Sequence, residues 1–201
     1  MDQRKYWDNT HLIYSGKDWI TKPTIFASQV VDYFPKSGTI LELGAGQGQD
    51  SQYFVSLGYQ VLATDFSDFA LSKIKKINTQ VVDLAQPLPF VPNSFDIVYS
   101  HLALHYFNAG RTQQLFDEIF TVLKSKGIFA TLTNTIDDQE VKQGTRIEDD
   151  FYQIGDIKKH FFSVDSMRKL TAKFKTVLLD NHGETHKDKI KSLIRFVGQK
   201  P

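Results

Sequence analysis

Three glycines at alternate positions follow an apolar run and precede a segment with helical periodicity. The run covers residues 40–43, and the glycines are Gly44, Gly46 and Gly48. Glycine lets the backbone turn sharply and approach a ligand closely, because it has no Cβ. Asp65 ends the next apolar run, nineteen residues after Gly46, and a carboxylate at a strand tip can accept hydrogen bonds from both hydroxyls of a ribose. The pattern therefore predicts a pocket for a nucleoside-type ligand.

The spacing of the glycines indicates which kind of nucleoside ligand is expected. Folds that bind the pyrophosphate of a dinucleotide have G-x-G-x-x-G, whose third glycine packs the helix against its strand. Here Gln49 stands at that third position, and Gly48 comes one residue early. This spacing argues against a nicotinamide-dependent oxidoreductase. The pattern is instead E-x-G-x-G-x-G, with Glu42 two residues before the first glycine.

This pattern resembles motif I of the class I S-adenosylmethionine-dependent methyltransferases. Residues 61–66 are similar to the ribose-binding strand end of that family, residues 81–84 to its adenine-contacting strand end, and residues 94–100 to its fourth strand. The four segments occur in the order of the family, and the resemblance covers residues 36–133. It implies S-adenosylmethionine as the cofactor and S-adenosylhomocysteine as its product.

The resemblance also implies a role for each residue at the strand ends. Asp65 is expected to hold the ribose diol and Phe66 to pack against adenine. Asp83 is expected to accept the adenine amino hydrogen, although an acid at this position can also cap a helix. Ser100 and His101 are expected near the methionine portion and the reactive methyl group. The implied cofactor-binding residues are Glu42, Gly44, Ala45, Gly46, Asp65, Phe66, Asp83, Leu84, Ser100 and His101.

His101 and His105 are four residues apart, a spacing that also occurs in zinc sites. The glutamate that a metallopeptidase needs is replaced by Leu102, and the chain has no cysteine, so no metal is expected. In the family, the corresponding segment borders the acceptor. His105 and Tyr106 are therefore the candidate catalytic residues, with an imidazole that can orient an acceptor or take its proton. The alternative is that they only pack in the core.

Composition limits the classes of function. The 201 residues fit one domain, and their formal net charge of +1 gives no basic surface for a nucleic acid. The absence of cysteine excludes disulfides. No apolar run has the length of a signal peptide or a membrane span, so we expect a cytoplasmic protein without a membrane partner.

Apolar runs and helical segments alternate over residues 39–133, which predicts βαβ units and a mostly parallel sheet. The predicted fold is α/β and Rossmann-like, with seven strands, helices on both faces and a C-terminal antiparallel hairpin. Three prolines make residues 86–93 a loop. Strands are expected at 39–43, 59–64, 80–82, 95–100, 127–133, 175–179 and 190–197, and helices at 47–57, 67–76, 111–123 and 164–172.

We expect one methyltransferase domain over residues 1–201, with the cofactor-binding core at 36–133 and a C-terminal helix and hairpin at 163–201. Residues 1–35 carry Tyr6, Trp7 and Trp19 and are expected to cover the cofactor, although these aromatic side chains can also simply staple the core. Residues 134–162 are too long and too polar for an ordinary connection and are expected to form an acceptor-side loop. Arg146 and Tyr152 are its candidates for the pocket.

The predicted function is methyl transfer from S-adenosylmethionine to a small molecule. The glycine segment and residues 64–67 are similar to the small-molecule branch, which includes tellurite-resistance and thiol methyltransferases. The D-P-P-Y or N-P-P-Y signature of enzymes that methylate nucleic-acid amino groups is replaced by residues 100–103. The expected partner is a small-molecule methyl acceptor, and the expected state is a monomer or homodimer. The alternative is a non-catalytic protein that binds S-adenosylmethionine or S-adenosylhomocysteine as a regulatory partner.

Overall fold

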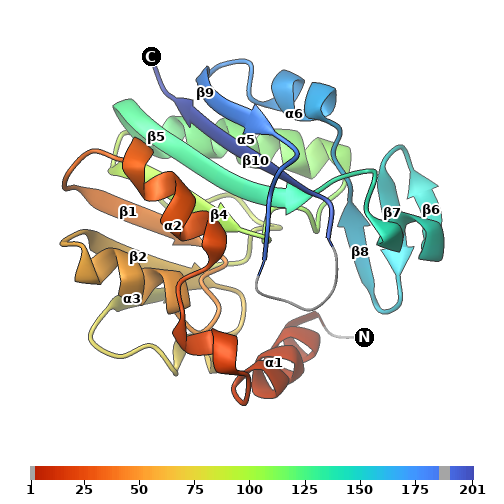
Figure 1. Cartoon of the computed structure of the whole chain (residues 1–201), viewed down its shortest axis with the longest axis horizontal. Coiled ribbons are helices and arrows are strands. Elements are labelled where there is room, and N and C mark those ends of the chain that lie inside the picture. The colour runs from red at the N-terminus through yellow and green to blue at the C-terminus, as the bar shows by residue number, and fades with distance from the viewer. Residues whose placement is uncertain (1–2, 186–190) are drawn as a thin grey trace.

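The computed structural model describes residues 3–185 and 191–201. Its main sheet has seven strands in the order β3-β2-β1-β4-β5-β10-β9 (Figure 1). Strands β3 to β5 pair in parallel, whereas β10 runs antiparallel to both of its neighbours. The predicted α/β fold with a C-terminal antiparallel hairpin is therefore confirmed. The strands are β1 (Thr39–Leu43), β2 (Gln60–Asp65), β3 (Asn78–Val81), β4 (Phe95–His101), β5 (Leu123–Asn134), β9 (Lys175–Asp180) and β10 (Leu193–Gln199).

Helices cover both faces of this sheet, and each face has its own hydrophobic core. Successive side chains of a strand point to opposite faces, so Ile97 belongs to one core and Val98 to the other. The first core contains residues of α2 (Ile25–Val30), α3 (Gln49–Ser56) and α4 (Asp68–Leu71). The second contains residues of α5 (Ala109–Val122) and α6 (Val164–Leu170). Burial on both faces explains why these strands have nearly continuous apolar runs.

The predicted elements differ from the observed ones mainly at their ends. The first strand has its predicted bounds, but the helix expected at 67–76 is only α4, a single turn that ends at Leu71. The chain has to turn into β3 by Asn78, and Lys76 has a left-handed backbone with φ of 62°. The last strand begins at Leu193, and the predicted start at 190 lies outside the described residues.

The prediction of a loop over residues 134–162 is wrong. This segment contains the short 3₁₀ helix η3 (Gln139–Gln143) and an antiparallel sheet of β6 (Thr145–Glu148), β7 (Phe151–Ile154) and β8 (Ile157–His160). Two tight turns make the sheet possible, because Asp150 and Gly155 adopt positive φ angles of 58° and 55°. Buried Phe151 and Phe161 anchor it. We call this element the small sheet.

The N-terminal segment consists of α1 (Gln3–Tyr14), the 3₁₀ helices η1 (Asp18–Thr21) and η2 (Val31–Tyr33), and α2 between them. In Figure 1, α1 and the small sheet both lie at the side of the molecule where the parallel strands end. Ligands of open α/β sheets bind at this edge. The two elements are therefore placed to enclose a ligand site.

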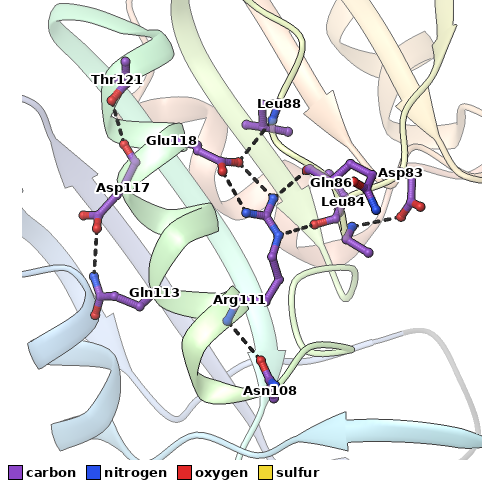
Figure 2. Close-up of polar contacts among 11 residues, drawn as sticks. Asp83, Leu84, Gln86, Leu88, Asn108, Arg111, Gln113, Asp117, Glu118 and Thr121 are labelled. Atoms are coloured by element: carbon purple, nitrogen blue, oxygen red, sulfur yellow. Dashed lines mark hydrogen bonds and ion pairs between the residues drawn. The ribbon is translucent and has the colours of Figure 1, made fainter.

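Arg111, in the first turn of α5, fixes the loop that follows β3 (Figure 2). Its Nε donates to the carbonyl of Leu84 at 2.8 Å and its Nη2 to the carbonyl of Gln86 at 2.7 Å. The same guanidinium makes a bidentate pair with Glu118, at 2.7 and 2.9 Å. Glu118 Oε2 also accepts the amide hydrogen of Leu88 at 3.2 Å. One ion pair thus holds three backbone groups of this loop.

We expect Arg111→Ala to lower the free energy of unfolding by about 1.5–3 kcal/mol, because the hydrogen bonds of a charged group are lost. The control is Arg168→Ala, whose exposed pair with Asp165 should contribute less than about 1 kcal/mol. Urea denaturation measures both variants. Hydrogen exchange at the Leu88 amide should accelerate only in Arg111→Ala. Equal stability loss in the two variants, with unchanged exchange at Leu88, would show that Arg111 does not hold the loop.

Candidate functional site

A pocket of about 1100 Å³ lies at the ends of the parallel strands. Its wall is formed by the glycine segment after β1, the residues that follow β2, β3 and β4, helix α1 and part of the small sheet. Both predicted catalytic residues and nine of the ten predicted cofactor-binding residues line it. Ser100 is the exception. The structure therefore brings residues from four strand ends to one cavity.

The backbone of the glycine segment requires glycine at both of its glycine positions that line the pocket. Gly44 has a φ of 79°, and a Cβ there would stand 2.2 Å from the Cβ of Ala103. Gly46 has a φ of 55°, and a Cβ there would stand 3.0 Å from the ring of His11. Any side chain would push the loop away from β4 or from α1. Gly44 therefore leaves space for Ala103 at the floor of the pocket, and Gly46 leaves space for His11 of α1, which covers the pocket.

Asp65, the last residue of β2, joins the glycine segment to the end of its own strand. Its Oδ2 accepts the amide hydrogen of Gly46 at 2.8 Å, and its Oδ1 accepts that of Ser67 at 2.9 Å. An ionised carboxylate offers about four lone-pair sites. Two of them remain for ligand hydroxyls, so the side chain can hold a ribose diol without releasing the loop.

Two buried acids lie at the β1 end of the pocket. Glu42 is 3% exposed and Asp50 is 2% exposed, and both line the cavity. Burial, and then the neighbouring Asp50, raise the pKa of Glu42 well above its ordinary value, although Ser51 donates a hydrogen bond to it at 2.5 Å. Asp50 accepts hydrogen bonds from the side chains of Thr24 and Tyr99. Such a pair favours a cationic ligand group, which stabilises the ionised carboxylates.

The residues predicted to contact adenine lie together at the rim. Phe66, Asp83 and Leu84 all line the pocket, and the guanidinium of Arg4 lies 4.4 Å above the ring of Phe66. Asp83 Oδ1 accepts the amide hydrogen of Ala85 at 2.9 Å, which orients its carboxylate. The clamp made by Arg111 fixes the carbonyl of Leu84 just beyond. The rim therefore combines an aromatic face with a fixed carboxylate.

Ser100 does not line the pocket, unlike its predicted neighbour His101. Its side chain is fully buried, and its hydroxyl donates to the carbonyl of Leu43 at 2.8 Å. The hydroxyl therefore ties β4 to the end of β1 beneath the glycine segment. The sequence placed Ser100 at the correct strand end, but the alternation of side chains along the strand turns it away from the cavity.

His105 and Tyr106 lie at a second end of the pocket, which we call the acceptor end. His105 is 1% exposed, and its Nδ1 has no hydrogen-bond partner within the part of the chain that the structure describes. Burial, followed by the positive charges of Lys159 and Lys191, holds the pKa of His105 well below its ordinary value. Burial also raises the pKa of Tyr106 well above its ordinary value. Both side chains are therefore neutral at pH 7.

Aromatic residues of the N-terminal segment cover the pocket. The ring of Trp7 lies 4.9 Å from that of Tyr106, and the rings of Tyr14 and Trp19 are 5.1 Å apart. Helix α1 is also tied to the strand ends, because Asp8 accepts a hydrogen bond from Ser67 at 2.5 Å. The segment predicted to be a cover is thus placed over the cavity, and its motion with ligand binding stays a prediction.

The small sheet and the preceding helix η3 supply pocket side chains that the sequence did not predict. Glu140, Ile157 and Lys159 line the pocket, whereas the predicted candidates Arg146 and Tyr152 do not. Arg146 is exposed and pairs with Asp149. The prediction failed because it assumed a flexible loop across the mouth, while the strands fix which side chains face inward. The acid at position 50, directly after the glycine segment, was a signal that was overlooked.

Among the described residues, no three histidine, cysteine, aspartate or glutamate side chains are grouped so that they could hold a metal ion. No helix within the described ranges is long and apolar enough to cross a membrane. The pocket is therefore best characterised by its carboxylates, aromatic rings and lysines.

Comparison with known proteins places these features in a family. Residues 41–131 match a family model described as a methyltransferase domain. An uncharacterized methyltransferase of Synechocystis sp. is 38% identical over 95 residues, which are 45% of this chain and 44% of that protein. A malonyl-[acyl-carrier protein] O-methyltransferase of Buchnera aphidicola is 30% identical over 162 residues, 78% of this chain and 62% of that protein. The chain thus spans less than half the length of the Synechocystis relative.

A solved structure shows the same fold. The 1,6-didemethyltoxoflavin-N1-methyltransferase of Burkholderia thailandensis, with bound 1,6-didemethyltoxoflavin and S-adenosylhomocysteine, superposes with a TM-score of 0.74 at 15% identity, over 99% of this chain and 85% of that chain. The match to the methyltransferase domain agrees with the resemblance predicted from the glycine segment and the strand ends. Residues 41–131 of this chain are therefore similar to a methyltransferase domain.

Proposed function

We propose that this chain transfers the methyl group of S-adenosylmethionine to a small-molecule acceptor bound at the acceptor end of the pocket. The cofactor supplies an activated sulfonium methyl. The acceptor's lone pair forms the new bond to the methyl carbon while the sulfur takes the electron pair of the breaking bond. The chain's own residues then have mainly to align the acceptor and exclude water. The observation that carries this proposal is one cavity with a carboxylate end and a histidine end.

Different residues of the cavity suit different groups of S-adenosylmethionine. Asp65 and Asp83 suit the ribose and adenine polar groups, and Glu42 with Asp50 suits the ammonium group of the methionine portion. Phe66 offers an apolar face to the adenine ring. These roles fit the cradle that glycine creates beside Ala103.

A small acceptor is supported by the covered shape of the pocket. Helix α1 lies over one side with Tyr6 and Trp7, and the small sheet closes another with Ile157 and Lys159. One relative is named for malonyl-[acyl-carrier protein], and one protein of similar fold is named for 1,6-didemethyltoxoflavin. The acceptor of this chain therefore has to be argued from its own pocket. The monomer or homodimer expected from the sequence stays a prediction.

At the acceptor end, His105 is proposed to orient the acceptor and take its proton. A neutral imidazole with an unpartnered Nδ1 can accept a hydrogen bond from a hydroxyl or an ammonium group. Tyr106 keeps its proton, because burial raises its pKa, and it can donate to the acceptor. A thiolate or carboxylate acceptor needs no base, and His105 would then act by positioning alone.

Cofactor binding can be tested by calorimetry. We expect S-adenosylhomocysteine to bind and NAD to bind much more weakly. Replacing Asp65 with Ala should weaken the binding of S-adenosylhomocysteine by about 1.5–3 kcal/mol, the usual loss for hydrogen bonds to a charged group. Asp68→Ala is the matched control, since Asp68 is exposed and lies outside the pocket. Tighter binding of NAD, or equal affinity in the two variants, would contradict the assignment.

Methyl transfer itself can be tested with a cell extract, methyl-labelled S-adenosylmethionine and untargeted mass spectrometry. We expect labelled products of low molecular mass that need the wild-type protein and fall with Asp65→Ala. Label confined to protein or nucleic acid would contradict a small-molecule acceptor. Retention of the cofactor without any labelled product across several extracts would favour a non-catalytic binding protein.

The role of His105 predicts a pH profile. A lowered pKa keeps the imidazole neutral at pH 7, so the acid limb of kcat/KM should lie below pH 6.5, and activity should be lost as the pH falls through that limb. If His105 is the base, His105→Ala should lower turnover by about a hundredfold or more, and S-adenosylhomocysteine affinity should change little. Loss of cofactor affinity and melting temperature in parallel with turnover would instead indicate a packing role.

A further inference from the structure

We propose that the methyl acceptor carries an oxyanion group, a carboxylate or a phosphate, which binds Lys159 and Lys191 at the acceptor end of the pocket. This inference rests on the proposed function and adds the substrate class to it. It concerns recognition of the acceptor, and no covalent step is involved.

The first observation is the state of the two lysines. Lys159 is only 9% exposed, and both lysines line the pocket. Each reaches one oxygen of Glu140, at 2.6 Å. An ammonium group has three donors, and Lys159 has no other hydrogen-bond acceptor within the described residues. Buried donors need partners, so two N–H groups of Lys159 remain for water or for acceptor oxygens of a ligand in the pocket.

The second observation is that His105 shares this location. The positive charges of Lys159 and Lys191 are, after burial, the largest causes of the lowered pKa of His105. The carbonyl of His105 accepts the amide hydrogen of His160 at 2.7 Å, so strand β8 is fixed against this segment. His105 and the two lysines therefore line the same pocket, and the unpartnered Nδ1 of His105 is itself buried.

The third observation is the contrast of charge along the pocket. Four carboxylates line the pocket beside the ends of β1, β2 and β3, those of Glu42, Asp50, Asp65 and Asp83. Lys159, Lys191 and Glu140 line its acceptor end, and Lys17 and Asp18 of the N-terminal segment also line the pocket. Asp138 lies behind Lys191, at 3.8 Å, and does not line the cavity. An anionic acceptor is thus repelled from the cofactor end and attracted to the lysines.

The competing interpretation is that the lysines serve only to hold Glu140 and thereby fix the small sheet. Burial alone would raise the pKa of Glu140, but the hydrogen bonds from Lys159 and Lys191 outweigh it and keep the carboxylate ionised. In this interpretation Glu140 is a necessary partner. In our interpretation the carboxylate of Glu140 binds both lysines and therefore competes with the oxyanion of the acceptor. The two interpretations predict opposite effects of removing the charge of Glu140.

The experiment uses the full chain saturated with S-adenosylhomocysteine and three probes of similar size: benzoate, phenyl phosphate and the neutral benzamide. Ligand-observed NMR titration measures each dissociation constant. We expect one of the two anions to bind at least about tenfold more tightly than benzamide. The preferred anion then identifies the oxyanion as carboxylate or phosphate. Lys159→Met and Lys191→Met should lose this preference, and Lys158→Met, an exposed neighbour on β8, should keep it.

Glu140→Gln provides the decisive variant, because it keeps the shape of the side chain and removes the negative charge that pairs with both ammonium groups. We expect the preferred anion to bind more tightly to Glu140→Gln than to the wild type, by about threefold or more. Unchanged or weaker binding, or benzamide binding as tightly as both anions to the wild type, would overturn the inference. The binding of S-adenosylhomocysteine distinguishes failure of this inference from failure of the proposed methyl transfer. A wild-type protein that does not bind S-adenosylhomocysteine would refute the proposed function itself.

Discussion

The site depends on the carboxylate of Asp65 and the two amide hydrogens that it accepts. Gly46 belongs to the turn after β1 and Ser67 to the turn after β2, so one side chain holds two strand ends in register. Charge-assisted hydrogen bonds of this kind are about twice as strong as neutral ones. Because both carboxylate oxygens are already oriented, a ligand that donates to them meets a group with little freedom left to lose. This preorganisation explains why an acid is needed at the tip of β2.

The cover over the pocket is built on residues next to Asp65. Phe66 packs beneath the guanidinium of Arg4, and Ser67 donates to Asp8, so α1 is anchored to the turn that Asp65 shapes. On the other side, the absence of a Cβ at Gly46 leaves room for the ring of His11. The position of the cover and the shape of the floor therefore both depend on the glycine segment. A change at Gly46 would disturb both, whereas a change on the outer face of α1, such as at exposed Leu12, would disturb neither.

The parts of the site that could be predicted from the sequence are those whose signals are local. Glycines after an apolar run, and acids at the ends of later runs, specify strand ends that a parallel sheet brings to one edge. The anchoring of Asp50 by Thr24 and Tyr99 joins three distant segments and left no local pattern. The small sheet was missed for another reason. Its strands are four residues long and mostly polar, and its turns depend on positive φ angles that only Gly155 suggests.

Burial at the two ends of the pocket shifts the pKa values of Glu42 and His105 in favour of their neutral forms, and each shift has a cost that depends on pH. The folded pKa of Glu42 lies above its unfolded value, so its contribution to stability falls as pH rises above 4.5. The folded pKa of His105 lies below its unfolded value, so its contribution falls as pH drops below 6.5. A fold selected for stability alone would place apolar side chains at both positions. The chain instead has the carboxyl group of Glu42 at a position where a ligand ammonium group would favour its ionised form. It has the imidazole of His105 at a position where an acceptor would offer a proton. The electrostatic cost at each end is thus matched to the ligand group expected there.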